Sequence, residues 1–346
     1  MRRSRLALPA AVLTVTATLA ACGSGAGDPA AGEDTDGTLV IYSGRNENLV
    51  GPVLDQLEDA VGIPVRVRYA GTSELAAQLL EEGEATDADL FFGQDAGALG
   101  ALGNAGMLTP LDQEVLDLVD EDYRDSEGRW VATSGRARVL AYDPEQVPEI
   151  DSITGIDQLL EPQWEGKIGF APSNASFHAF VTALRVDRGE DGAREWLEAF
   201  AAQDPQAYEN NIAVLDAVDA GQVALGLINH YYWYQRAAEV GEENVDARIH
   251  FLDNDDPGAL INVAGAGVIA GTDQPDAAAR AIAFLLSDEI QQYFADETAE
   301  YPVVEGVESA VFDLPPLSEL QGNRIDLNDL ESLDRTLALL DEVGLT

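Results

Sequence analysis

The first third of the chain alternates between two patterns of hydrophobic and polar positions. The β-branched content of 38–44 predicts a buried strand, and further strands are expected at 63–71 and 88–95. The segments that follow each run carry apolar residues at helical spacing and predict helices at 49–61, 72–83 and 96–108. Strand and helix that alternate at this length are typical of a parallel, doubly wound α/β sheet.

A second α/β series follows a long extended run at 131–143. Strands are expected at 166–172, 223–229 and 247–253. Helices are expected at 176–187, 192–202, 212–221 and 231–241. Another long apolar run, 260–271, comes next, and we expect helices from there to the C-terminus.

Two α/β series joined by two extended runs predict a hinged, two-lobed binding protein. We expect the two doubly wound lobes to be joined by a two-crossing hinge. Lobe 1 is expected to comprise 38–135 plus 262–312, and lobe 2 to comprise 136–261 plus 313–346. Ligands on such sheets bind beyond the carboxyl ends of the strands.

The N-terminus has the pattern of a targeting segment. A basic start, MRRSR, precedes 15 apolar or small residues, which are too few to span a bilayer comfortably. The run ends in LAAC at Cys22, the single cysteine, so residues 1–22 resemble a lipoprotein signal peptide with a lipobox. An ordinary signal peptide with a chance cysteine is the alternative. The small, polar, glycine-rich residues 23–37 predict a flexible tether. We therefore expect a lipid anchor on Cys22 at the extracytoplasmic face of the cell membrane.

The formal net charge of −44 argues against nucleic acid as a partner, because phosphate backbones need basic faces. The acids are spread along the chain, which favours surface adaptation to salt over a dedicated cation-attracting patch. Once Cys22 carries lipid, no cysteine remains for a disulfide, a thiolate metal site or a nucleophile. The three histidines, His178, His230 and His250, lack metal-protease spacing, and neither a serine-nucleophile elbow nor a phosphate loop occurs. The sequence therefore does not indicate an enzyme.

The stretch GLINHYYWYQR, 226–236, places four aromatic residues in a row. Adjacent residues in a helix point about 100° apart, so two neighbouring phenols can converge only at a helix start or turn. The preceding strand pattern and Asn229, a possible cap, allow a helix to begin there. Paired phenolates at Tyr231 and Tyr232 suit a hard, highly charged cation that displaces their protons. The alternative is an aromatic patch that closes the interface between helix and sheet.

From residue 38 to the C-terminus the chain resembles the ferric-ion-binding proteins of bacterial iron ABC transporters, a branch of the type II periplasmic binding proteins. The resemblance rests on several motifs in order: LVIYSGRNENLVGP, ADLFFGQDAGALG, VATSGRARVLAYD, GKIGFAPSNASFHAFVTALR, GLINHYYWYQR, NVAGAGVI and EYPVVEGV. It implies that Tyr231 and Tyr232 supply phenolates to Fe3+, while Trp233 and Tyr234 pack against neighbours.

The resemblance also implies a synergistic anion, phosphate or carbonate, at a helix N-terminus. The matching turn is PSNASF, where Asn174, Ala175 and Ser176 would offer donors. Asn211 and Asn229 match two further anion contacts of the phosphate-using members. Neutral donors fit this role because two phenolates leave about one positive charge on a ferric ion, which the anion offsets.

The first lobe departs from the family pattern. Asn46 stands where some members carry a histidine ligand, and Glu47 where others carry a tyrosine. Gln94 replaces a glutamate ligand, and Ser176 occupies the place of a third tyrosine. Glu47 is therefore expected to supply a carboxylate, with Asp95 as a weaker candidate. The alternative for Glu47 is a solvated acid at a helix start.

Arg45, Arg136 and Arg138 stand out in so acidic a chain. They either orient a ligand carboxylate or phenolate, or pair with acids across the hinge. The expected function is a monomeric receptor that binds Fe3+, catalyses nothing, and passes its cargo to an ABC permease and ATPase. One alternative is a binder of a ferric chelate, such as citrate-bound iron, or of a plain oxyanion. A cell-surface hydrolase is another, for which no nucleophile–base pattern exists.

Overall fold

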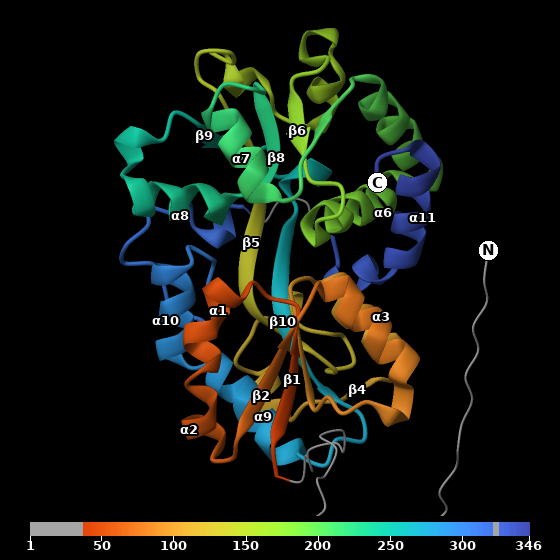
Figure 1. Cartoon of the computed structure of the whole chain (residues 1–346), viewed down its shortest axis with the longest axis vertical. Helices are drawn as coiled ribbons and strands as arrows, with labels where there is room; N and C mark the ends of the chain where they lie inside the picture. Colours follow the sequence, from red (N-terminus) through yellow and green to blue (C-terminus); the bar gives the residue numbers. More distant parts are fainter. Residues whose placement is uncertain (1–36, 321–324) are drawn as a thin grey trace, which may run out of the picture. The chain divides into compact units, whose positions relative to one another are not determined.

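The computed structural model describes residues 37–320 and 325–346 (Figure 1). The predictions for the signal peptide, for Cys22 and for the tether before Gly37 lie outside this range. The strands are β1 (Leu39–Ser43), β2 (Val65–Tyr69), β3 (Leu90–Gly93), β4 (Leu108–Thr109), β5 (Val131–Tyr142), β6 (Ile168–Phe170), β7 (Gln206–Ala207), β8 (Leu225–Asn229), β9 (Arg248–His250) and β10 (Ile261–Ile269). The helices are α1 (Glu47–Leu54), α2 (Leu57–Val61), α3 (Thr72–Glu82), α4 (Ala96–Asn104), α5 (Gln113–Leu116), α6 (Ala175–Ala202), α7 (Asn211–Asp219), α8 (His230–Val240), α9 (Pro275–Leu285), α10 (Asp288–Glu297) and α11 (Leu333–Val343). None of the helices in these two ranges is both long and apolar enough to cross a membrane.

The first lobe is built on the strand order β2-β1-β3-β10. The strands β2, β1 and β3 are parallel, and β10 runs antiparallel to β3. Both β1 and β3 are buried along their whole length, as expected for strands covered on both faces. Helices α1 to α4, α9 and α10 supply the rest of the core of this lobe.

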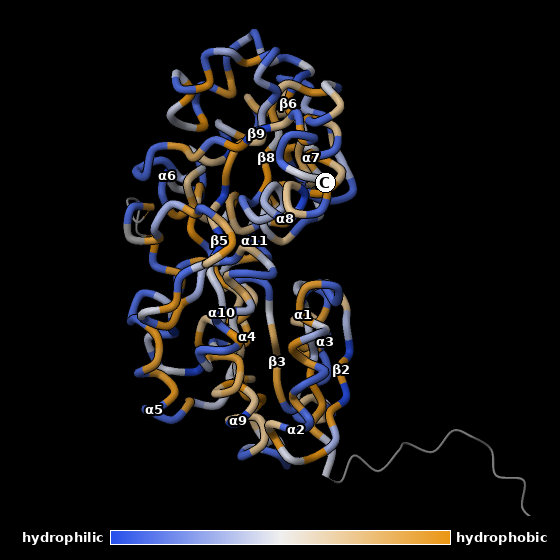
Figure 2. Tube along the Cα trace, turned by 90° about the vertical axis from the view of Figure 1, so that its left-hand side faces the viewer, coloured by the Kyte–Doolittle hydropathy of each residue, from blue (hydrophilic) through white to orange (hydrophobic). Residues whose placement is uncertain are grey.

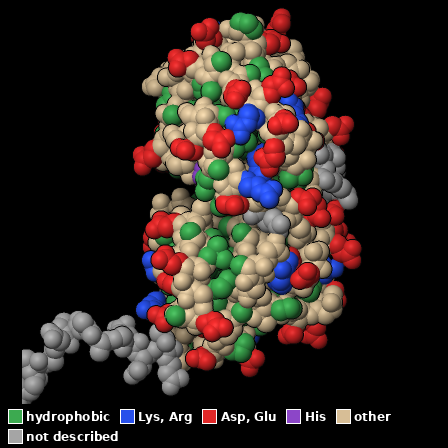
Figure 3. Space-filling model, turned by 90° about the vertical axis from the view of Figure 1, so that its right-hand side faces the viewer, with side chains coloured by type: hydrophobic (Ala, Val, Ile, Leu, Met, Phe, Trp, Pro, Cys, Tyr) green, Lys and Arg blue, Asp and Glu red, His purple; other side chains and the backbone are tan. Residues whose placement is uncertain are grey.

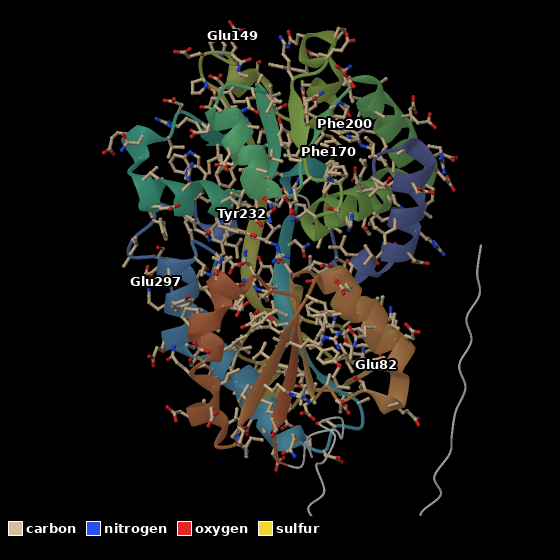
Figure 4. All side chains as sticks on the ribbon, in the orientation of Figure 1. Glu82, Glu149, Phe170, Phe200, Tyr232 and Glu297 are labelled. Carbon is tan, nitrogen blue, oxygen red and sulfur yellow. The ribbon has the colours of Figure 1, made fainter. Side chains whose placement is uncertain are left out.

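The second lobe is built on β8, β6 and β7, which are parallel to one another, with β9 paired to β5. Alternate residues of β5 belong to two different hydrophobic cores. Leu140 packs with α6 and α11, while Val139 and Ala141 pack with α7 and α8. Helices therefore cover both faces of this sheet. A stack of aromatic rings that includes Phe170 and Phe200 fills the α6 side (Figure 4).

Strand β5 passes from one lobe to the other and changes its partner on the way. Its residues 131–137 pair with β10, and its residues 138–142 pair with β8. The change occurs between Ala137 and Arg138. All but the last residue of β5 are buried, and so are all but the first of β10. Together β5 and β10 form the crossing through the middle of the molecule (Figure 1). The architecture is therefore the expected one of two α/β lobes joined by two crossing strands.

Local departures from the sequence analysis have simple physical causes. The helix expected at 49–61 is two helices, α1 and α2, separated by Asp55 and Gln56. Helix α6 is broken at Gly189, whose φ of 72° is one that glycine adopts readily, so the two helices expected there are present. The expectation of helices up to the C-terminus is wrong between α10 and α11. The described residues there form turns, one of which, Leu327–Glu331, packs on α4.

The hydrophobic residues follow the strands and the inner faces of helices, and polar residues occupy the outer turns (Figure 2). Acidic side chains are scattered over both ends of the face drawn in Figure 3 and outnumber the basic ones there. This distribution agrees with the formal net charge of −44.

Candidate functional site

The two adjacent tyrosines lie at the start of α8, directly after β8. Asn229 has the extended backbone of an N-cap residue (φ −96°, ψ 150°), but its side chain makes no cap hydrogen bond. The rings of Tyr231 and Tyr232 are 4.2 Å apart between centroids, at an angle of 35°. The helix start therefore brings two neighbouring phenols together, as the sequence required. Tyr231 is 2% exposed, and Tyr232 is half-buried beside the crossing strands (Figure 4).

The environment of Tyr231 keeps its phenol protonated when no cation is present. Burial raises the pKa of Tyr231 well above its ordinary value, and the neighbouring Tyr232 raises it further. Arg136 pulls this pKa in the opposite direction. Only a strong competitor for the phenolate, such as a highly charged metal ion, would displace this proton at neutral pH.

The other two aromatic residues of the stretch hold α8 in place. The Trp233 Nε1–H donates to the carbonyl of Ala247 at 2.8 Å, and the Tyr234 hydroxyl donates to the carbonyl of Asp313 at 3.1 Å. Both side chains therefore have partners away from the Tyr231–Tyr232 pair.

A corner of amide and hydroxyl groups lies where α6, α7 and α8 begin. Asn174 caps α6, Asn211 is the first residue of α7, and Asn229 precedes α8. The Asn174 Oδ1 accepts hydrogen bonds from the Ser176 N–H at 3.0 Å and from its hydroxyl at 2.7 Å. The Asn211 amide donates to the Ser176 Oγ at 3.0 Å. Ala175 follows the Asn174 cap, so the structure brings all five expected anion-binding residues to helix starts or caps.

Arg138 completes this corner from β5. Its guanidinium donates to the Ser176 Oγ at 3.1 Å and to the Asn229 Oδ1 at 3.4 Å. Burial lowers the pKa of Arg138 to about 10, and attraction to Tyr232 and Tyr231 opposes this shift, so the side chain stays charged at neutral pH. The Asn229 Nδ2 and the Asn211 Oδ1 are buried without a hydrogen-bond partner. A buried amide with a free donor beside a charged guanidinium suits a bound oxyanion.

The first lobe presents two loops, at the ends of β1 and β3. Asn46 caps α1 and is exposed, as is Glu47, the first residue of that helix. Gln94 is half-buried, and Asp95 is a buried cap of α4 that accepts from the Ala98 N–H at 3.0 Å. Arg45 is buried and lies close enough to Tyr231 and Tyr232 to interact with both electrostatically.

Arg136 is a buried cation with few partners. Its only hydrogen bond among the described residues runs to the carbonyl of Val263 at 3.4 Å, and its Nε and Nη1 have none. Neither Arg136 nor Arg138 forms an ion pair within that range, whereas Arg45 pairs with Glu300. Burial lowers the pKa of Arg136, and attraction to Tyr231, Glu300 and Asp95 counteracts the shift. The groups around the tyrosines thus carry more positive than negative charge.

The three histidines do not form a catalytic set. The Nε2 atoms of His178 and His250 hydrogen-bond to the carbonyls of Pro172 and Ile153, each at 2.8 Å. His230 is fully buried, and burial lowers its pKa to about 4. In the described part of the chain, no three His, Cys, Asp or Glu side chains form a group that could hold a metal ion.

Comparisons with other proteins identify the family of the chain. The model of the bacterial extracellular solute-binding protein family matches residues 85–331. The chain belongs to this family. It is 34% identical over 311 residues to the Fe(3+)-binding periplasmic protein of Serratia marcescens, covering 90% of this chain and 91% of that protein. It is 32% identical over 316 residues to the major ferric iron-binding protein of Neisseria meningitidis, covering 89% and 93%.

Solved structures show that this solute-binding protein has the expected fold of a type II periplasmic binding protein. Iron-bound HitA from Pseudomonas aeruginosa matches with a TM-score of 0.83 and 34% identity, over 89% of this chain and 99% of that one. A Trichodesmium protein in complex with iron and citrate matches with a TM-score of 0.74 and 25% identity, over 90% and 100%. The relatives are solute-binding proteins and not enzymes, as the sequence indicated.

Sequence reasoning missed two buried groups of this solute-binding protein that lie next to the site. Glu300 binds Arg45, and it opens the motif EYPVVEGV that contributed to the family resemblance. His230 directly precedes the tyrosine pair, but was considered only as a catalytic candidate. Its position between strand and helix was the available signal.

A cavity of about 610 Å³ lies away from the tyrosine pair. The turn Glu121–Ser126 and the segment Ile325–Asn328 line most of it, together with Ile261 and Leu320. None of the site residues described above borders it.

Proposed function

We propose that this solute-binding protein captures extracellular ferric ion through the phenolates of Tyr231 and Tyr232, together with a synergistic anion. It then delivers the ion to the permease and ATPase of an ABC transporter. The observation that carries the proposal is the pairing of two phenol rings, with centroids 4.2 Å apart, beside the amide–arginine corner. The ferric-binding names of its relatives point the same way.

Loading then releases protons. A ferric ion binds phenolate and not phenol, and the raised pKa of Tyr231 means that this proton is present in the empty site. We therefore expect the Tyr231 proton to be released when a ferric ion binds at neutral pH.

The charge around the site favours a bound anion. Arg45, Arg136 and Arg138 supply three positive charges, and Glu300, Asp95 and Glu47 supply at most three negative ones. A ferric ion with two phenolates adds one positive charge. Hydrogen phosphate or carbonate at the corner of Asn174, Ala175, Ser176, Asn211 and Asn229 would offset this excess.

We assign the first-lobe ligand to Glu47 in preference to Asp95. Asp95 is buried, its Oδ1 caps α4, and burial raises the pKa of its carboxyl. Glu47 is exposed at the end of β1 and makes no ion pair among the described residues. It is therefore free to turn toward the tyrosines when the lobes close. Asn46 and Gln94 line the same side as neutral donors.

The proposal includes a monomer that is anchored by lipid on Cys22 at the extracytoplasmic face of the membrane. It rests on the LAAC motif and on the polar tether after it. Replacing Cys22 with Ser should release the protein into the medium, and a variant that stays membrane-bound would contradict the lipid anchor.

A second candidate cargo is a ferric chelate such as iron citrate. The excess positive charge and the missing first-lobe histidine and tyrosine favour an anionic chelator that supplies its own oxygen ligands. A Trichodesmium protein of the same fold was solved with iron and citrate. A plain oxyanion without metal would leave the tyrosine pair unused.

The test is a visible absorption spectrum of the protein without its tether. It is recorded after iron removal and again after adding ferric ion with phosphate, carbonate or citrate. We expect a phenolate-to-iron band at about 450–500 nm that weakens in Tyr231→Phe and Tyr232→Phe and is unchanged in the Tyr234→Phe control. The anion that strengthens the band identifies the partner. A wild-type protein that stays colourless with every anion would overturn the proposal.

A further inference from the structure

His230 connects three segments of the chain that are distant in sequence. It is the first residue of α8, it is fully buried, and it immediately precedes the tyrosine pair. Its Nδ1 accepts a hydrogen bond from the backbone N–H of Ala137 in β5 at 3.1 Å. Its Nε2 lies 2.8 Å from the carbonyl oxygen of Ala299.

These two partners determine the state of the ring. A backbone N–H can only donate and a carbonyl can only accept, so Nδ1 must be bare and Nε2 must carry the hydrogen. A second proton on Nδ1 would face the Ala137 N–H. The ring of Tyr301 stacks on the imidazole at 4.8 Å and closes the remaining side. His230 is therefore a neutral imidazole, with Nε2 as a fixed donor and Nδ1 as a fixed acceptor.

Ala137 is the last β5 residue paired with β10 before β5 pairs with β8. The hydrogen bond between His230 and Ala137 thus holds the start of α8 against β5, at the point where β5 passes from one lobe to the other. The tyrosines follow within two residues, so this bond sets the direction in which their rings leave the helix.

Ala299 belongs to a short turn, Thr298–Glu300, that we call the Thr298–Glu300 corner. It follows α10 of the first lobe, and Ala299 has a φ of 55°, which non-glycine residues rarely adopt. A second side chain of α8, Gln235, donates to the Thr298 carbonyl at 2.8 Å. On its other side the corner holds Arg45 through Glu300. The tyrosine helix is thus joined through the corner to the first-lobe loop that carries Arg45.

We propose that His230 is a positioning residue that couples the tyrosine pair to the first lobe. Its bond to Ala137 orients the phenols, and its bond to Ala299 transmits lobe closure to the helix that carries them. This inference rests on the proposed tyrosine ligation of iron.

Two variants separate the two bonds. Asparagine can place its oxygen near the position of Nδ1, so His230→Asn keeps the acceptor for Ala137 and loses the contact with Ala299. Glutamine can place its amide nitrogen near the position of Nε2, so His230→Gln keeps the donor to Ala299 and loses the acceptor. His250→Gln is the matched control, because His250 also binds a backbone carbonyl but lies outside the site.

The measurements are the iron charge-transfer band, the rate of iron loss to a competing chelator, and the radius of gyration with and without iron. For His230→Asn we expect an unchanged band but about tenfold faster release and a smaller compaction on loading. For His230→Gln we expect a shifted or weakened band. His250→Gln should match the wild type in all three measurements. Wild-type values in both His230 variants would overturn the proposal and leave His230 as packing only.

A substitution at a buried ring can prevent folding, so a milder variant of the same connection is included. Gln235→Ala removes the neighbouring tie to the corner from a half-buried position. We expect it to fold and to release iron about threefold faster with an unchanged band. Unchanged release in Gln235→Ala, if the His230 variants do not fold, would also overturn the proposal. If the wild type shows no band, the proposed function itself fails, and that outcome is distinct from a failure of the coupling.

Discussion

Arg45 and Glu300 meet through two parallel hydrogen bonds, with Nη1–Oε1 at 3.0 Å and Nη2–Oε2 at 2.6 Å, although 255 residues separate them. Both side chains are almost fully removed from water, and the Thr298 hydroxyl gives Glu300 a further bond at 3.2 Å. A buried ion pair gains little over an apolar core, but losing one partner leaves the other charge uncompensated. The pair therefore fixes a guanidinium beside the tyrosines. Removing either partner would destabilise the fold considerably.

We expect Glu300→Gln to lower the free energy of unfolding by about 3–5 kcal/mol, because Arg45 would remain charged in the core. Urea denaturation at neutral pH measures the change. The control is Glu342→Gln, which removes the partner of Arg194 in an exposed pair and should change the free energy of unfolding far less. Equal effects of the two substitutions would show that burial does not govern the Arg45–Glu300 pair.

The amide–arginine corner predicts that a charged side chain at position 211 weakens anion binding. We expect Asn211→Asp to reduce the gain in ferric affinity caused by phosphate by about tenfold or more, because a carboxylate would replace a donor and repel the anion. Asn210→Asp is a matched control, since Asn210 caps the same helix through its side-chain oxygen and aspartate caps equally well. Isothermal titration with and without phosphate provides the comparison. If Asn210→Asp lowers the phosphate effect as strongly, the effect is a general one of added charge.

Thr72 joins the two first-lobe loops of the site. Its hydroxyl donates to the Gly44 carbonyl at 2.9 Å and accepts from the Gln94 N–H at 3.1 Å. We expect Thr72→Val, which has nearly the same shape, to cost about 1–3 kcal/mol of stability, because both backbone groups lose their partner. Thr72→Ser keeps the hydroxyl and should cost less. Amide hydrogen exchange at Gln94 should accelerate only in the valine variant, and unchanged exchange there would show that the two loops are held independently.

Asp125 predicts a pH dependence of stability. Burial alone would raise the pKa of Asp125, but hydrogen bonds and attraction from Arg129 outweigh it and hold the pKa below its ordinary value of 3.8. Its contribution to stability is therefore complete above about pH 4 and is lost as the pH falls through the lower folded-state value. We expect Asp125→Asn to be destabilised by about 2 kcal/mol at pH 7 and progressively less below pH 4. Thermal unfolding from pH 3 to pH 7 tests this, and a difference that stays constant down to pH 3 would contradict the role of the carboxylate charge.

Much of the fold could be predicted because each lobe repeats a local pattern. The strands β1, β3, β6 and β8 are short apolar runs with glycine or polar residues at their ends, and the helices between them have regular apolar spacing. The unusual length of β5 and β10 indicated the crossing. The turns between α10 and α11 could not be predicted, because Leu327 and Leu330 are apolar at a spacing that also fits a helix, and their contact with α4 is a long-range one.

The site likewise has one part that the local sequence could predict and one part that it could not. Tyr231 and Tyr232 are neighbours in sequence, and the strand before them indicated where their helix begins, so local information was enough to pair them. Glu300 lies 255 residues from Arg45 and 70 from His230, and no local pattern links these three residues. Their association depends on how α10 packs against the crossing strands, which only the three-dimensional structure shows.

The arginines are buried beneath a strongly acidic surface. The proposed ferric ion and the proposed anion therefore meet opposite electrostatic forces as they approach. The outer field attracts cations and repels anions over roughly a Debye length, about 10 Å at 0.1 M salt. The interior around Arg136 and Arg138 has the opposite sign. A free dianion therefore meets a barrier on approach that a cationic ferric species does not. Added salt lowers that barrier, so under the proposed function a saline medium would let the anion follow the metal inward.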